Sequence, residues 1–198
     1  MLKLYSDPRA PESHRTRIVL AEKELPVTTV DIDSENMPAS FLELNPYGKL
    51  PTVIDRDTVF FESSVVNEYL DERYPHPPLK PGSPSGRAQM RLAVMRIEQE
   101  IYPIFDNLVR VKKKTEPAKK LKAYLETLNT YLAHQEYFVA EQYSLADITL
   151  APLLWRLTPN GIDVSELRHL QAYMDRLFER PAFRRSLTED EEMFHAIF

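Results

Sequence analysis

Apolar residues recur at different spacings in the two halves of the chain, and the first half mixes strand and helix patterns. Leu2 and Leu4 alternate with polar residues, so they suit one face of a first strand. The apolar run at residues 18–21 belongs to a first helix, and Val30 and Ile32 mark a second strand. The chain therefore begins with the pattern of a strand, a helix and a strand.

The next stretch predicts a short helix, a hairpin and a longer helix. Pro38 suits the first turn of the short helix, which is expected to end near Asn45. Residues 52–54 and 58–61 predict two strands joined by a tight connection. One face of the longer helix carries Val65, Val66, Tyr69, Leu70 and Tyr74. The resulting order β-α-β-α-β-β-α is that of the thioredoxin fold.

Residues 75–86 separate this region from the rest of the chain. They hold five of the 16 prolines and two of the four glycines, so they can form neither a helix nor a central strand. We interpret this segment as an ordered, semi-rigid linker. The expected organisation is an α/β thioredoxin-like domain at 1–75, a proline-rich linker at 76–86 and an all-helical domain at 87–198.

After the linker the apolar period is helical throughout, and no internal repeat is evident. Residues 144–147, Ser-Leu-Ala-Asp, form a capping box that predicts a helix start. A kink is expected at Pro103, because proline lacks the amide hydrogen that a helix interior needs. Three apolar stripes run along Met90, Val94, Ile97, Ile101 and Leu108; Leu121, Tyr124, Leu125, Leu128 and Leu132; and Leu167, Leu170, Tyr173, Met174, Leu177 and Phe178.

Composition narrows the class of protein. The 198 residues are 43% hydrophobic and 28% charged, which is an ordinary globular balance. Cysteine is absent, so a disulfide, a thiolate metal site or a protein thiol nucleophile is excluded. The net charge of −5 makes direct nucleic-acid binding unexpected, because such binding depends on neutralising phosphates. Without a signal-peptide pattern or a membrane-length apolar run, the chain is expected to be soluble and cytoplasmic, with no membrane partner.

One pairing of short motifs predicts a ligand pocket. Leu50-Pro51 precedes a predicted strand, and a cis bond there would turn the backbone of Leu50 toward a ligand. Glu62 and Ser63 follow the last predicted strand, where the free N–H groups of a helix start favour a carboxylate. This arrangement resembles the glutathione pocket of the glutathione transferase superfamily. The resemblance implies that Leu50 pairs with the cysteinyl backbone, while Glu62 and Ser63 hold the γ-glutamyl end.

The same pocket residues have simpler explanations. Ser63 can be an ordinary helix cap, and Glu62 can merely complement the helix dipole. Lys49 could meet a carboxylate of glutathione, although a loop lysine is more often only solvated. No cofactor is therefore expected as a requirement, and retained glutathione binding stays open.

The resemblance also identifies a missing group. Transferases of this superfamily stabilise the glutathione thiolate with a Tyr, Ser or Cys, which in two classes precedes an Arg-x-Arg run. Residues 15–17 match that run, and the register then places Ala10 at the activating position. A lost hydrogen bond to the thiolate, worth about 1.5–3 kcal/mol, leaves its pKa about one to two units higher. Tyr5, Ser6 or Ser13 could substitute; otherwise Tyr5 packs against the first helix and the serines cap it.

The remaining polar motifs are expected to be structural. The acidic residues 189–192 suggest an exposed tail, and the basic run at residues 110–114 suggests a solvated helix end. No histidine has a spacing from carboxylates that predicts metal ligands, so no metal site is expected. The histidines expected at the surface or at helix caps are His14, His134, His169 and His195.

Four stretches resemble the stringent starvation protein A family within that superfamily. They are residues 14–23, 45–52, 67–79 and 151–157. The resemblance implies a glutathione S-transferase fold without transferase activity, which agrees with Ala10. It also implies a dimeric transcription regulator that associates with RNA polymerase and its primary sigma factor in starvation and acid stress.

The family's Pro-His-Pro motif maps onto Pro75, His76 and Pro77, with Tyr74 and Pro78 beside it. Proline-rich segments lose little conformational entropy on docking, so this segment is suited to bind a protein partner. The alternative is a linker that prolines merely stiffen. At the level of function, the rivals are a glutathione-dependent enzyme that uses Tyr5 or a nearby serine, and a glutathione-binding sensor without turnover.

Overall fold

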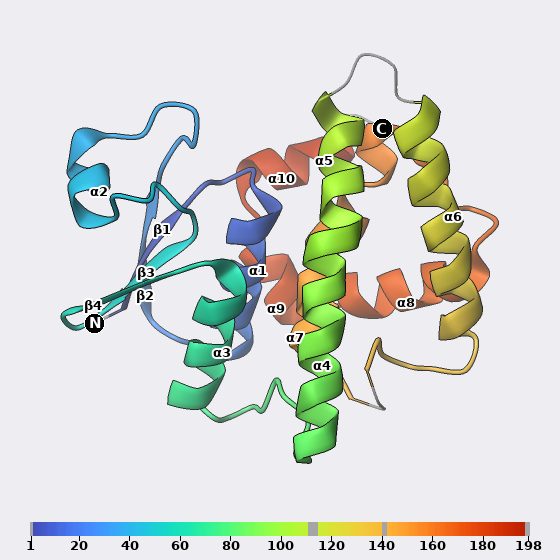
Figure 1. Ribbon diagram of the computed structural model, residues 1–198, viewed down its shortest axis with the longest axis horizontal. Helices are drawn as coiled ribbons and strands as arrows, with labels where there is room; N and C mark the ends of the chain where they lie inside the picture. Colours follow the sequence, from blue (N-terminus) through green and yellow to red (C-terminus); the bar gives the residue numbers. More distant parts are fainter. Residues whose placement is uncertain (1, 111–114, 140–141, 197–198) are drawn as a thin grey trace. The chain divides into compact units, whose positions relative to one another are not determined.

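The computed structural model describes residues 2–110, 115–139 and 142–196, and the side chains as far as residue 194. The lysines of the basic run at residues 110–114 and the side chain of His195 lie outside the described part. The chain divides into two compact units (Figure 1). Unit 1 comprises residues 2–77 and Pro181–Ala196, and unit 2 comprises Pro78–Arg180. The last two helices of the chain are thus part of the first unit.

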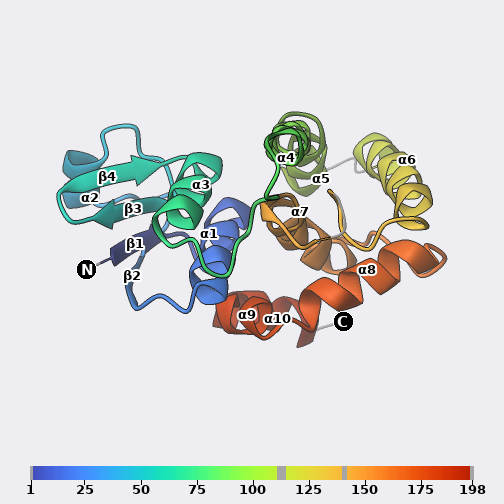
Figure 2. The ribbon, with the colours of Figure 1, turned by 90° about the horizontal axis from the view of Figure 1, so that it is seen from below.

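Unit 1 contains a four-stranded sheet with the strand order β2-β1-β3-β4 (Figure 2). Strand β1 is parallel to β2 and antiparallel to β3, and β3 forms a hairpin with β4. The elements are β1 (Leu2–Ser6), α1 (Pro11–Glu22), β2 (Val27–Asp31), α2 (Ala39–Leu44), β3 (Thr52–Asp55), β4 (Thr58–Phe61), α3 (Ser63–Arg73), α9 (Pro181–Ser186) and α10 (Glu189–Ala196). The predicted thioredoxin order β-α-β-α-β-β-α is confirmed.

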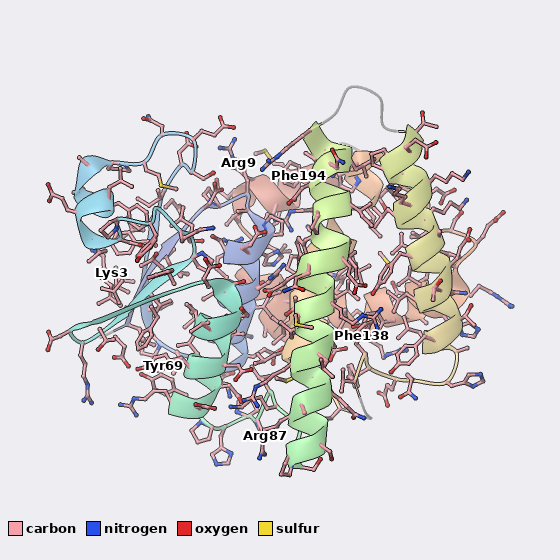
Figure 3. The ribbon with its side chains drawn as sticks, viewed as in Figure 1. Lys3, Arg9, Tyr69, Arg87, Phe138 and Phe194 are labelled. Atoms are coloured by element: carbon pink, nitrogen blue, oxygen red, sulfur yellow. The ribbon has the colours of Figure 1, made fainter. Side chains whose placement is uncertain are left out.

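The alternation of side chains across the sheet separates two faces. Leu4 pairs with Val53, and both are buried in the core. Phe60, in register with Val53, stacks on Tyr69 of α3 with ring centroids 4.0 Å apart. Figure 3 labels Tyr69 beside α3. Tyr5 belongs to the opposite face, because neighbouring strand residues point to opposite sides. This face carries α2, whose Phe41 ring lies 5.4 Å from that of Tyr5.

Unit 2 is helical. It comprises α4 (Pro84–Arg96), a π-helical turn at Ile97–Ile101, α5 (Tyr102–Arg110), α6 (Thr115–Leu132), α7 (Leu145–Trp155), a 3-10 turn at Thr158–Asn160 and α8 (Arg168–Phe178). The π turn lies just before Pro103, and in it the N–H of Tyr102 donates to the carbonyl of Ile97. The kink expected at Pro103 stays a prediction. All eleven residues of α7 are buried.

The capping box of α7 is confirmed, and its carboxylate also joins other parts of unit 2. Asp147 Oδ2 accepts from the N–H of Ser144 at 2.8 Å. Its Oδ1 accepts from the N–H of Phe138 at 2.8 Å and from the hydroxyl of Tyr173 in α8 at 2.7 Å. Burial raises the pKa of the Asp147 carboxyl, against the lowering effect of these hydrogen bonds. A carboxylate that is fully enclosed thus joins three segments of the unit.

Replacing Asp147 by Ala is expected to lower the free energy of unfolding by at least about 2 kcal/mol, because each buried donor left without an acceptor costs about 1–3 kcal/mol. Urea denaturation measures the change. Glu126→Ala, at an exposed position of α6, is the control and should have little effect. Equal stability of the two variants would contradict the structural role of Asp147.

Candidate functional site

The predicted glutathione-pocket residues meet at one edge of the sheet in unit 1. The Leu50–Pro51 peptide bond is cis, as the sequence motif suggested, and Pro51 is buried just before β3. Thr52 pairs with Phe61 across the β3–β4 hairpin, so the residues flanking this pair, Pro51 and Glu62, are neighbours. The tertiary structure therefore brings together the two motifs from which the pocket was predicted.

The polar side chains at this edge already have partners within the protein. Ser63, the first residue of α3, is buried, and its Oγ accepts from Nη1 of Arg15 in α1 at 3.1 Å. The Glu62 carboxylate is half exposed and lies 3.7 Å from the Lys49 ammonium. Glu62 also has a φ of 68°, in the left-handed region that non-glycine residues seldom occupy. A ligand carboxylate would have to compete with Glu62 for Lys49, or meet the free N–H groups at the start of α3.

The position expected to activate a thiol lies at the start of α1 and carries no functional group. Ala10 is the residue that caps this helix, and its N–H donates to Asp7 Oδ1 at 3.2 Å. Asp7 also accepts from the N–H groups of Arg9 at 2.8 Å and Ser34 at 3.3 Å. Burial favours the neutral form of Asp7, but these hydrogen bonds outweigh it and lower the pKa of its carboxyl. The loop is thus held by a carboxylate that contacts backbone amides.

The three candidate substitutes have structural contacts. Ser6 and Ser13 are fully buried. Ser6 Oγ accepts from Arg17 Nη1 at 2.7 Å, and Ser13 Oγ accepts from the N–H of Asp7 at 3.0 Å. The ring of Tyr5 does not lie on the α1 face of the sheet, so the expectation that it packs against the first helix is wrong. It packs on α2, because an odd-numbered position of β1 points away from the core that holds Leu4.

The proline-rich segment has exposed side chains and an anchored backbone. Pro75, His76, Pro77 and Pro78 are exposed, Tyr74 is half-buried, and the His76–Pro77 bond is cis. The guanidinium of Arg73 lies 5.2 Å from the centroid of the Tyr74 ring. Below, residues 74–78 are called the Tyr74–Pro78 segment.

A lysine that the sequence did not single out anchors this segment. The ammonium of Lys23, the residue that ends α1, donates to the backbone carbonyl of Pro77. It also lies 2.6 Å from Oδ1 of Asp71 in α3, and both side chains of this ion pair are buried. A local pattern could not identify this role, because it depends on the end of α1 meeting α3 and the linker.

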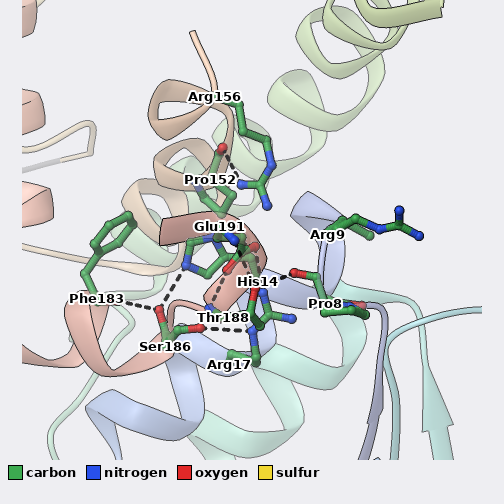
Figure 4. Close-up of polar contacts among 12 residues, drawn as sticks. Pro8, Arg9, His14, Arg17, Pro152, Arg156, Phe183, Ser186, Thr188 and Glu191 are labelled. Atoms are coloured by element: carbon green, nitrogen blue, oxygen red, sulfur yellow. Dashed lines mark hydrogen bonds and ion pairs between the residues drawn. The ribbon is translucent and has the colours of Figure 1, made fainter. Parts of the chain in front are cut away.

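A second buried charge cluster corrects two expectations (Figure 4). His14 was expected at the surface or at a helix cap, and residues 189–192 were expected to be an exposed tail, yet His14 and Glu191 are both 0% exposed. His14 Nδ1 lies 3.3 Å from Glu191 Oε1, and Arg17 Nη2 donates to the same oxygen at 2.7 Å. Thr188 donates its N–H to Glu191 Oε2 at 3.1 Å, at the start of α10. The acidic stretch is a capped helix whose third residue pairs with α1.

The side chains of Ser186, His14 and Glu191 contact one another in the order of a Ser–His–acid triad, but the serine is buried. The Nε2 atom of His14 lies 3.0 Å from Ser186 Oγ, on the side of the ring opposite Glu191. The Ser186 hydroxyl donates to the carbonyl of Phe183 at 2.7 Å, and the side chain is buried. A serine nucleophile must give its proton to the histidine and reach a substrate. Because Ser186 is buried, its hydroxyl is not exposed to a substrate, and these contacts join α9 and α10 to α1.

Among the described residues, no group of three or more His, Asp or Glu side chains is placed to hold a metal ion. Within the same ranges, no helix combines the length and the apolar character needed to cross a bilayer.

Comparison with known proteins shows to which family the chain belongs. The family model of the glutathione S-transferase N-terminal domain matches residues 4–78, and that of the C-terminal domain matches residues 72–181. A stringent starvation protein A homolog from Pasteurella multocida is 41% identical over 194 residues, covering 94% of this chain and 90% of the relative. A homolog of the same name from Haemophilus ducreyi is 40% identical, covering 94% and 90%.

A solved structure supports the same fold. The crystal structure of glutathione transferase Omega 3C from Trametes versicolor is 26% identical in sequence, with a TM-score of 0.85. The similarity covers 99% of this chain and 89% of that protein. The predicted combination of a thioredoxin-like α/β domain and an all-helical domain, the glutathione S-transferase fold, is confirmed.

Replacing Glu191 by Ala is expected to destabilise the protein by about 3–5 kcal/mol, since it removes the buried carboxylate that the Arg17 guanidinium and the His14 imidazole both contact. The adjacent Glu192 is exposed, so Glu192→Ala makes a matched control that should change stability little. Thermal and urea unfolding of both variants measure the difference. If Glu191→Ala were as stable as Glu192→Ala, the cluster would not hold α10.

Proposed function

Because the chain belongs to the glutathione S-transferase superfamily and, within it, to the stringent starvation protein A homologues, we propose that it regulates transcription and does not catalyse glutathione chemistry. In this proposal the protein binds RNA polymerase holoenzyme, including the primary sigma factor, during stress and starvation. The contact surface is the Tyr74–Pro78 segment. The protein acts in the cytoplasm and needs no cofactor.

The observation that carries the non-catalytic part is the environment of Ala10. Its methyl group offers no donor to a thiolate, and the loop around it is held by Asp7 through backbone amides. The hydroxyl groups of Ser6 and Ser13 are buried in contacts of their own. An unactivated thiol is only a few per cent ionised at neutral pH, so glutathione bound here would be a weak nucleophile.

The binding part rests on the Tyr74–Pro78 segment. Its prolines and His76 are exposed, while the backbone is fixed through Pro77. A segment ordered before binding loses less conformational entropy when a partner docks. Aromatic and apolar side chains on such a segment are suited to a protein partner rather than to the phosphates of a nucleic acid. The net charge of −5 supports the same choice.

A homodimer is part of the proposal. In unit 2, Leu92 and Met95 expose 55% and 42% of their surface on α4. Leu92 lines a cavity of about 460 Å³ together with other residues of α4, the π turn, α6 and Phe138. Leu92 and Met95 are three positions apart on α4, so they lie on one face of this helix. An apolar patch exposed in this way is typical of a surface that another chain covers.

Polymerase capture tests the binding surface. The double variant His76→Ala/Pro77→Ala should bind polymerase holoenzyme about tenfold more weakly or worse, because truncating anchor residues at an interface typically costs about 1–2 kcal/mol each. Biolayer interferometry with purified holoenzyme measures the dissociation constant. The control His134→Ala/Pro26→Ala removes the same two residue types at other exposed positions and should bind normally.

Sedimentation of the wild type and both double variants checks that the oligomeric state is unchanged. Equal affinity of both double variants would remove the Tyr74–Pro78 segment from the proposal.

The rival function is a glutathione-dependent enzyme, whether transferase, peroxidase or isomerase, using Tyr5 or a nearby serine. The observation in its favour is the shared edge formed by Lys49, Leu50, Pro51, Glu62 and Ser63, together with the similarity to a named glutathione transferase. A third candidate is a sensor that binds glutathione at this edge without turnover.

Two measurements separate these candidates. With glutathione and a general electrophile, the wild-type protein should show no conjugation above the uncatalysed rate, and Tyr5→Phe should change nothing. Turnover that Tyr5→Phe abolishes would establish the enzyme instead. Calorimetric titration with glutathione then distinguishes the other two. Heat of binding that Ser63→Ala reduces, without turnover, identifies the sensor.

A further inference from the structure

Lys23 is a buried lysine whose ammonium donates hydrogen bonds to a carboxylate and to a backbone carbonyl. Its side chain is 0% exposed, and that of Asp71 is 4% exposed. The ammonium contacts Asp71 Oδ1 at 2.6 Å and also donates to the carbonyl of Pro77. The three residues belong to the end of α1, the last turns of α3 and the Tyr74–Pro78 segment, all within unit 1.

The composition of the Tyr74–Pro78 segment explains why it needs such a donor. Pro75, Pro77 and Pro78 have no amide hydrogen, so in residues 75–78 only His76 can donate from the backbone. Such a segment cannot be fixed by a hydrogen-bonded ladder or helix. It can be tied down through its carbonyl groups, which require donors from elsewhere. The ammonium of Lys23 supplies that donor at Pro77.

Stability alone does not account for a lysine at this position. Removing two charges from water is costly, and replacing a buried ion pair by apolar residues of similar size is often neutral or stabilising. An apolar pair, however, would leave the Pro77 carbonyl without its donor. What distinguishes Lys23 from an apolar residue is therefore the hydrogen bond that it donates to the Pro77 carbonyl.

We propose that Lys23, oriented by Asp71, is a positioning residue that fixes the Tyr74–Pro78 segment in its partner-binding form. The ammonium holds the Pro77 carbonyl inward, so the side chains of His76 and Pro78 are presented outward. The proposal rests on the proposed function in one respect only, namely that polymerase is the partner of this segment. The ordering of the segment by Lys23 is a property of the free protein.

The test uses the double variant Lys23→Met/Asp71→Leu, which exchanges the ion pair for apolar residues of similar size. Its urea midpoint should equal or exceed that of the wild type, so folding is retained. The backbone order parameter of His76, the only amide in residues 75–78, should fall from about 0.85 to below about 0.6. Affinity for polymerase holoenzyme should fall about tenfold, because the segment must then be ordered on binding.

One further variant keeps the test decisive if the double variant loses stability. Asp71→Asn alone keeps an oxygen acceptor for Lys23, so it should retain more of the His76 order and of the affinity than the double variant does. If the double variant kept both a rigid His76 amide and wild-type affinity, the positioning role would be overturned. A double variant too unstable to study would also contradict the proposal, since it would make the ion pair a requirement for folding.

Failure of the proposed function gives a different result. In that case His76→Ala/Pro77→Ala would bind polymerase normally, whereas the order parameter of His76 would still decide whether Lys23 fixes the segment. A rigid His76 amide in the double variant overturns the positioning role regardless of what the segment binds.

Discussion

Every polar side chain that α1 buries needs a partner from another element, and unit 1 is arranged around this requirement. Four consecutive buried residues of α1, Ser13, His14, Arg15 and Thr16, are polar. Their partners lie in the loop after β1, in α9 and α10, and in α3. A buried polar group left without a partner costs about 1–3 kcal/mol, so α1 is stable in its place only when these elements are docked.

The same requirement shapes the chemistry of the site. In a pocket that activates a thiol, a hydroxyl near the start of α1 would face the ligand. In this protein Ser6 and Ser13 contact Arg17 and the backbone of Asp7, and Ser63 contacts Arg15. The polar groups around the glutathione-like edge thus stabilise the fold of unit 1. A superfamily scaffold can retain its architecture while the functions built on it differ.

Buried charges serve different purposes in the two units. In unit 2, Asp147 is surrounded by neutral donors, and burial raises its pKa. In unit 1, Glu191 lies between the guanidinium of Arg17 and the imidazole of His14, and Lys23 lies between a carboxylate and a carbonyl. The first arrangement joins helices of one bundle. The arrangements in unit 1 join segments that are distant in sequence, including the C-terminal helices and the proline-rich segment.

Elements whose signals are local can be predicted from the order of amino acids. The order of strands and helices in unit 1, the capping box at Ser144 and the helical stripes of unit 2 follow from apolar spacing and turn chemistry, which act over a few residues. The meeting of Pro51 and Glu62 was also predictable, because a hairpin joins them and a family motif marks both. Ala10 could be identified from its register with the Arg-x-Arg run.

Which charged side chains are buried could not be predicted in this way, because it depends on how distant elements pack. His14, Glu191 and Lys23 look like surface residues in sequence, because charged side chains are almost never fully buried unless paired. Their partners come from other elements, as far apart as α1 and α10, and no local pattern reports such a pairing. These contacts are essential because burying an unpaired charge is costly. The paired groups meet only through the packing of elements that are distant in sequence.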